Sequence, residues 1–159
     1  AQRFNIRFTG TDVVQQLLDY ARRKCPAHYQ FKKHCELSIP MVDSSVDIAS
    51  AFSVFTHLLH EETFIYLEDM RRVLRPGGKI VLSHVEFAAA HQWPVFAATV
   101  QQKKTAVRAP LNMFIECSAI LVWARHLGLE VVETINGSLH PWGDQPLGQS
   151  IAILQRPMG

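Results

Sequence analysis

The stretch 72–83 constrains the fold of this chain more than any other part of the sequence. It ends an amphipathic run that begins at Glu61 and whose apolar residues have helical spacing: Phe64, Leu67, Met70, Val73 and Leu74. Pro76 cannot continue this helix, because it has no N–H and its ring clashes with the preceding turn. The glycines at 77–78 can adopt the positive φ of a sharp reversal, and an aliphatic strand, 80–82, follows directly. The stretch therefore predicts a helix that returns the chain to the next strand of a parallel sheet.

Length and composition are typical of a globular protein. The 159 residues suit one domain, and 48% apolar residues are enough to build a core. A formal charge of +2 is too small to indicate a nucleic-acid partner or an anionic membrane, and no apolar run reaches the roughly 18–20 residues of a membrane span. Cys25, Cys35 and Cys117 form no Cys-x-x-Cys pair, which argues against a disulfide framework and a zinc site. We therefore expect a reduced, cytoplasmic protein.

Hydrophobic periodicity divides the chain into alternating strands and helices. The predicted strands are residues 4–8 (ending near Gly10), 29–34, 46–52, 80–83, 129–135 and 150–154. The predicted helices are residues 13–24, the run from Glu61, a short helix near Pro94, and 116–127. This alternation predicts an α/β fold with a mostly parallel sheet, and the closing pair of strands without a helix between them predicts an antiparallel edge.

The Arg-Val-Leu-Arg-Pro-Gly-Gly core of the 72–83 stretch resembles the entry to the fifth strand of class I S-adenosylmethionine-dependent methyltransferases. Nearly the whole chain fits that family from its second strand onward, most closely over residues 43–83. The resemblance implies a Rossmann-like sheet, S-adenosylmethionine as cofactor, and methyl transfer to an oxygen, nitrogen or carbon atom of a small-molecule acceptor. It also implies a single methyltransferase-like domain, 1–159, in which residues 84–113 form an insertion that lines or covers the acceptor pocket.

The family's first strand and its Gly-x-Gly-x-Gly loop have no counterpart in this sequence. In the family that strand lies between the second and the fourth, so a sheet without it would consist of two half-sheets with unpaired edges. We therefore expect that the natural polypeptide is longer, or that a second copy or a partner chain covers this edge by association or strand exchange.

Ligands of doubly wound sheets bind at the carboxyl ends of strands, so the residues that follow each predicted strand are the site candidates. Asp12, next to Thr11, stands where the resemblance implies a carboxylate that binds both ribose hydroxyls of the cofactor; a helix cap is the alternative. The loop of His34, Cys35 and Glu36 stands where the family holds the adenine, with His34 in place of the usual aspartate. An exposed polar loop is the alternative there.

The loop after the strand at 46–52 stands where the resemblance places the reacting centre. Phe52 and Ser53 are expected to contact the cofactor, Phe52 because aromatic faces attract the positive sulfonium. Phe55 is expected to contact the acceptor, although phenylalanines in an apolar run also suit a core. His57 is the candidate general base, since an imidazole can accept a proton near neutral pH; a solvent-facing or capping histidine is the alternative.

Further candidates follow the strand at 80–83. His84 is a second catalytic candidate, and Glu86 is expected to bind substrate together with Trp93 from the insertion. His57 and His60 have helical spacing for a metal, but no third ligand stands at a recognisable distance, so we predict no metal site.

Two other functions fit the same sequence. A methyltransferase-like module without catalysis, acting in binding or assembly, is favoured by the missing glycine loop and by His34. A nicotinamide-dependent dehydrogenase also alternates strands and helices, but it explains the 72–83 stretch and the final strand pair less well.

Overall fold

The structure, a computed structural model, describes residues 6–105, 111–138, 141–142, 145–146 and 148–159. The chain divides into two compact units, Ala1–Pro40 and Met41–Gly159. Part of the predicted first strand, Phe4 and Asn5, lies outside the described residues.

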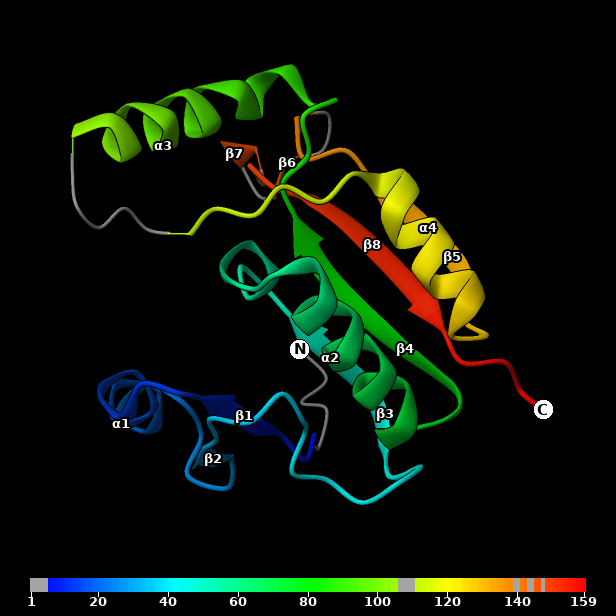
Figure 1. The fold of residues 1–159 in the computed structure, drawn as a ribbon. Helices are drawn as coiled ribbons and strands as arrows, with labels where there is room; N and C mark the ends of the chain where they lie inside the picture. Colours follow the sequence, from blue (N-terminus) through cyan, green and yellow to red (C-terminus); the bar gives the residue numbers. More distant parts are fainter. Residues whose placement is uncertain (1–5, 106–110, 139–140, 143–144, 147) are drawn as a thin grey trace. The chain divides into compact units, whose positions relative to one another are not determined.

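The first unit is a small parallel β-α-β motif (Figure 1). Strand β1 (Thr9–Asp12) leads into helix α1 (Gln15–Lys24), and strand β2 (Gln30–Lys33) pairs with β1 in parallel. Gly10 lies inside β1, opposite Phe31, instead of ending a strand as predicted. A Cβ at Gly10 would lie 3.0 Å from the Phe31 ring, so the glycine allows a close approach of side chain and backbone.

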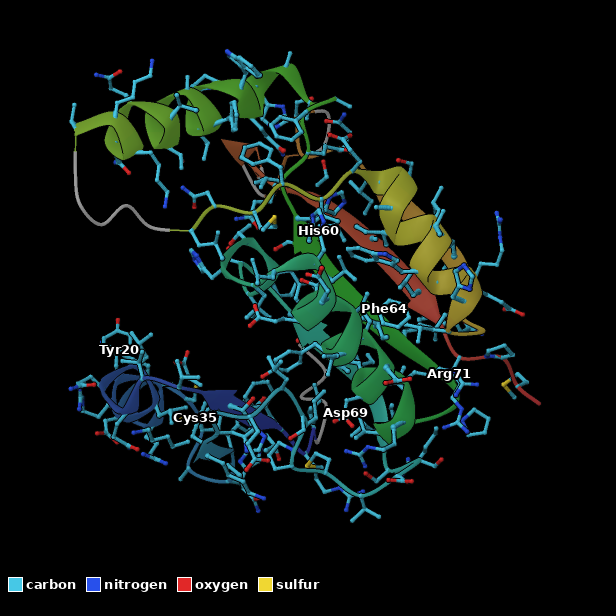
Figure 2. The ribbon with its side chains drawn as sticks, in the orientation of Figure 1. Tyr20, Cys35, His60, Phe64, Asp69 and Arg71 are labelled. Carbon is cyan, nitrogen blue, oxygen red and sulfur yellow. The ribbon has the colours of Figure 1, made fainter. Side chains whose placement is uncertain are left out.

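Helix α1 buries little of its apolar surface. Leu18 is its one buried residue, whereas Leu17 and Tyr20 are each 56% exposed. Figure 2 shows Tyr20 on this helix. The helix begins at Gln15, two residues later than predicted.

The second unit contains a four-stranded sheet in the order β3-β4-β8-β5 (Figure 1). Strands β3 (Val46–Ala51) and β4 (Leu74–His84) are parallel. Strand β8 (Ser150–Gln155) is antiparallel to β4 and to the edge strand β5 (Glu130–Ile135). The predicted α/β fold with an antiparallel C-terminal edge is therefore confirmed.

Helices and short turns connect these strands. Helix α2 (His60–Val73) joins β3 to β4 and packs on β4, and helix α4 (Cys117–His126) packs on β5 and β8. Helix α3 (Trp93–Thr105) is longer than the short helix predicted, and it lies past the arrowhead of β4 (Figure 1). The remaining elements are the 3₁₀ turns η1 (Phe55–His57) and η2 (Ala90–Gln92) and the two-residue strands β6 (Pro141–Trp142) and β7 (Gln145–Pro146).

The 72–83 stretch ends helix α2 as predicted, but the strand begins earlier than expected. Leu74 already pairs with Val46, and the register then shifts before Lys79 pairs with Ile48. The residues between form a bulge, which explains why a proline is tolerated there. Within this bulge Gly77 has φ +78°, the left-handed region that favours glycine.

The core of the second unit lies between α2, α4 and the sheet. Its fully buried side chains come from each of these elements: Leu67, Val73, Leu74, Ile80, Leu82, Ile120 and Leu154. Burying each side chain of this size contributes about 1.5–3 kcal/mol. A rigid sheet supported in this way fixes the loops at the carboxyl ends of β3 and β4.

Candidate functional site

A pocket of about 390 Å³ lies in the second unit, where β3 and β4 end. This is the edge at which parallel sheets bind ligands. Two of its lining residues, Ser53 and His57, were predicted site residues, and none of the described lining residues carries a formal charge. The lining consists of Ser53, Thr56, His57, Val85, Val95, Asn112, Gly148 and Gln149.

A closed ring of hydrogen bonds lies beside this pocket and links three strand ends. The backbone N–H of Ser53 donates to Ser83 Oγ at 2.8 Å, and Ser83 Oγ donates to Gln149 Oε1 at 2.6 Å. Gln149 Nε2 then donates to Ser53 Oγ at 2.9 Å. Ser53 has φ +55°, a left-handed conformation that costs a residue with a Cβ roughly 1–2 kcal/mol. The ring therefore connects a strained loop after β3 to the end of β4 and the start of β8.

The segment 111–115 runs beside the loop after β3 and is held there by three histidine side chains. His57 Nδ1 donates to the carbonyl of Leu111 at 3.0 Å, and His60 Nε2 donates to the carbonyl of Phe114 at 3.1 Å. Figure 2 shows His60 at the start of α2. His84 Nδ1 donates to the carbonyl of Ile115 at 2.9 Å. Because a carbonyl only accepts, each of these ring nitrogens carries a hydrogen.

The two catalytic candidates have different surroundings. His57 is exposed and lines the pocket, and its Nδ1–H is engaged, so in the neutral ring Nε2 carries the lone pair. His84 is 1% exposed, and burial lowers its pKa despite the opposing effects of the Ile115 carbonyl and of Glu86. His84 therefore lies in the interior as a neutral ring that supports the 111–115 segment.

Glu86 is also buried, with 7% of its surface exposed. Its carboxylate accepts hydrogen bonds from Ser150 Oγ at 2.6 Å and from the backbone N–H of Cys117 at 3.4 Å. Its own N–H donates to Gln92 Oε1, while Gln92 Nε2 donates to the carbonyl of Gly148. The predicted substrate-binding glutamate thus joins the end of β4 to the first residues of α4 and β8.

The aromatic candidates divide between core and surface. Phe55 is fully buried, as expected if it belongs to the core instead of the acceptor site. Phe52 is 50% exposed. Trp93 is 55% exposed and contacts Phe96, with ring centroids 5.2 Å apart. Phe96 in turn contacts Phe114, so the start of α3 is attached to the core through aromatic rings.

The predicted ribose and adenine residues lie in the first unit. Asp12 Oδ1 accepts the N–H of Val14 at 2.7 Å, which forms a turn just before α1. It does not cap the helix, because Val14 is the N-cap residue and no side chain caps α1. Asp12 and Thr11 also line a hollow of about 260 Å³ beside α1. In the other loop, His34 Nε2 is hydrogen-bonded to Ser38 Oγ at 2.9 Å, and both Cys35 and Glu36 are exposed.

Sequence reasoning missed several residues of the pocket. Gln149, Asn112 and Thr56 line it, and of these only Thr56 lies in a loop that follows a predicted parallel strand, between the candidates Phe55 and His57. Gln149 comes directly before a predicted strand, and its neighbours in space are 66 and 96 residues away in sequence. Gln149 would be found from sequence only by a rule that also considers the polar residue directly before each predicted strand.

The described part of the chain offers neither a metal-binding cluster nor a membrane-spanning helix. No group of three histidine, cysteine, aspartate or glutamate side chains there is placed to hold a metal ion. No described helix is long and apolar enough to cross a membrane.

Comparison with known proteins gives a family match over residues 1–82, more than half of the chain, to the family described as a methyltransferase domain. The tRNA N(3)-cytidine methyltransferase METTL2 of Gallus gallus is 31% identical over 74 residues, which are 46% of this chain. Those residues span only 20% of the length of that relative.

Solved structures with low sequence identity have the same fold. An S-adenosylmethionine-dependent methyltransferase from Mesorhizobium loti has a TM-score of 0.70 at 12% identity, covering 94% of this chain and 80% of that one. The methyltransferase in complex with the Trm112 activator of Haloferax volcanii has a TM-score of 0.69 at 18% identity, covering 95% and 72%. A third, from Methanosarcina mazei, has a TM-score of 0.68 at 16% identity, covering 95% and 82%. The chain therefore belongs to the methyltransferase domain family, as its 72–83 stretch predicted, and S-adenosylmethionine is the cofactor that this family implies.

Proposed function

We propose that this chain takes part in methyl transfer from S-adenosylmethionine to an oxygen, nitrogen or carbon atom of a small molecule. The observation that carries the proposal is the pocket at the ends of β3 and β4, which His57 and Ser53 both line. When bound, the cofactor supplies a methyl group on a positively charged sulfur. The protein then needs to orient the acceptor, exclude water and accept a proton.

The residues of this chain fit the cofactor's chemistry. Asp12 has one carboxylate oxygen engaged by Val14, and its Oδ2 has no partner among the described residues, so it is available to a ribose hydroxyl. The exposed Phe52 ring suits a cationic sulfur. The loop of His34, Cys35 and Glu36 keeps its proposed contact with the adenine, chiefly through the exposed residue Cys35.

His57 is the proposed general base. Its Nδ1–H is held by the Leu111 carbonyl, which leaves Nε2 as the proton acceptor of the neutral ring. In our proposal His84 supports the pocket through Ile115 and Glu86 through Ser150, while Trp93 borders the acceptor from the 84–113 insertion.

Two observations favour other candidates. The tRNA methyltransferase relative raises a nucleic-acid acceptor as the second candidate, which the small net charge of +2 opposes. A non-catalytic methyltransferase-like module is the third, because the sequence contains no Gly-x-Gly-x-Gly loop. In either catalytic case we place the protein in the cytoplasm.

Calorimetric titration tests the proposal, on this chain and on the full-length gene product. We expect binding of S-adenosylmethionine and S-adenosylhomocysteine but not of NAD. Asp12→Asn should weaken S-adenosylhomocysteine binding roughly tenfold, because a charged hydrogen bond contributes about 1.5–3 kcal/mol, while asparagine can still accept the N–H of Val14. The exposed Glu68→Gln is the matched control. Binding of neither cofactor form by the gene product would leave the non-catalytic module as the better reading.

A further inference from the structure

Ser53 combines a strained backbone with a hydroxyl that faces the pocket. It is one of two non-glycine residues with positive φ in the described part of the chain, the other being Ser44 at +51°. Strain of this kind persists only where surrounding contacts hold it, and it concentrates at ligand sites. In Ser53 those contacts are the Ser83 oxygen on its N–H, the Gln149 amide on its Oγ, and the Thr56 hydroxyl on its carbonyl.

The hydrogen bonds of the ring leave the Ser53 hydroxyl hydrogen unused. Ser53 Oγ accepts from Gln149 Nε2, so the hydroxyl hydrogen must point elsewhere. It has no acceptor among the described residues, and Ser53 lines the pocket. A ligand atom that accepts hydrogen bonds strongly would give this hydroxyl a partner.

The pocket's described lining also limits how a carboxylate can be bound. It contains no lysine or arginine, so the carboxylate of the cofactor's methionyl part would be met by neutral donors. Asn112 Nδ2 and Gln149 Nε2 each use one of their two hydrogens, on Thr99 Oγ1 and Ser53 Oγ, and keep the second. The Ser53 hydroxyl is the pocket donor that the strained loop after β3 holds in place.

We propose that Gln149 is a positioning residue that, with Ser83, holds Ser53 so that its hydroxyl donates a hydrogen bond to the methionyl carboxylate of the bound cofactor. The inference rests on the proposed function, because that function brings the cofactor to this pocket. It assigns the start of β8 a role in cofactor binding.

The test compares two ligands by calorimetry. S-adenosylhomocysteine carries the carboxylate, and 5′-methylthioadenosine lacks it. Ser53→Gly should bind S-adenosylhomocysteine about tenfold more weakly and 5′-methylthioadenosine unchanged, since only one ligand has the acceptor. Its thermal midpoint should equal or exceed that of the wild type, because glycine relieves the left-handed strain. Lower affinity with undiminished stability separates ligand contact from misfolding.

Ser44→Gly is the matched control, because it removes the same strain at the opposite end of β3 and should leave both affinities unchanged. Gln149→Ala should also weaken S-adenosylhomocysteine selectively, with the exposed Gln16→Ala as its control. In the free protein, Gln149→Ala should speed hydrogen exchange of the Ser53 amide about fivefold, as expected for the loss of a supporting hydrogen bond.

Each outcome decides between the two proposals. Equal losses for both ligands, or unchanged S-adenosylhomocysteine binding in Ser53→Gly, would overturn the carboxylate contact and leave the proposed function standing. An unchanged exchange rate at Ser53 in Gln149→Ala would overturn the positioning role. If the wild type bound neither ligand, the proposed function would fail and the carboxylate contact with it.

Discussion

At the scale of single residues, two histidines with the same chemistry have opposite surroundings. His57 is exposed at the pocket, whereas His84 is buried, and each donates from Nδ1 to a carbonyl of the same segment. Burial makes protonation of His84 costly, because the charged ring loses its hydration. Because of this cost, the contribution of His84 to the free energy of unfolding decreases as the pH is lowered.

Since the pKa of His84 is lowered in the folded state, the unfolded chain binds more protons below about pH 6.5. The contribution of His84 to stability is therefore complete above that pH and is lost as the pH falls below it. Replacement by asparagine, whose amide can still donate to Ile115, should remove this dependence. The free energy of unfolding in urea, measured from pH 8 to pH 5, should fall more steeply for the wild type than for His84→Asn.

The difference in the free energy of unfolding between the wild type and His84→Asn is expected to grow by at most about 1.4 kcal/mol for each pH unit below 6.5. Other titrating groups are present in both proteins and cancel in that difference. Parallel curves would show that His84 does not titrate differently on folding.

The sequence was a better guide to residue position than to residue contact. It placed Ser53 and His57 after a strand, and both line the pocket. It also placed Glu86 and His84 at the substrate, but both side chains are buried. Strand ends can be read from local periodicity, whereas the direction of a side chain depends on partners such as Gln149 that are distant in sequence.

At the scale of elements, α3 is the least supported helix. None of its described residues is buried, and aromatic contacts of Phe96 with Phe87 and Phe114 attach its first turn. Aromatic pairs of this kind contribute about 0.5–1.5 kcal/mol each beyond their buried area. The helix was predicted to begin near Pro94, and it does, but its length of 13 residues was not evident because the turn at 101–104 is polar.

Phe96→Ala should release α3 locally without unfolding the sheet. Loss of the aromatic contacts lowers the free energy of local opening, so trypsin should cleave after Lys103 or Lys104 several-fold faster than in the wild type. The thermal midpoint should change little, because Phe96 is only partly buried.

Val95→Ala is the control, since this exposed side chain shortens without any aromatic contact. Equal cleavage rates in the wild type and Phe96→Ala would mean that other contacts hold the helix.

At the scale of the whole molecule, the described strands form separate ladders. Strands β1 and β2 pair only with each other, and β3 has one neighbour, β4. Two-stranded sheets are marginally stable alone, and open strand edges invite further pairing. In the first unit this coincides with an exposed apolar face formed by Leu17 and Tyr20 on α1 and by Val13 just before it.

We expect the 159-residue chain to self-associate through this face. In sedimentation velocity the wild type should contain dimers or larger species, and Leu17→Glu should shift it toward monomer, because a charge on the face is costly to bury. Gln16→Glu adds the same charge at the neighbouring exposed position and should have no such effect. A monomeric wild-type chain that unfolds in one cooperative step would contradict this expectation.

The three histidines that hold residues 111–115 set a limit on how this region can change in length. His57 and His60 reach acceptors that are each 54 positions further along the chain, so the two segments run in matched register. Deleting or inserting one residue within 111–115 would displace these bonds together. Homologous or engineered chains should therefore keep the length of residues 111–115 unchanged.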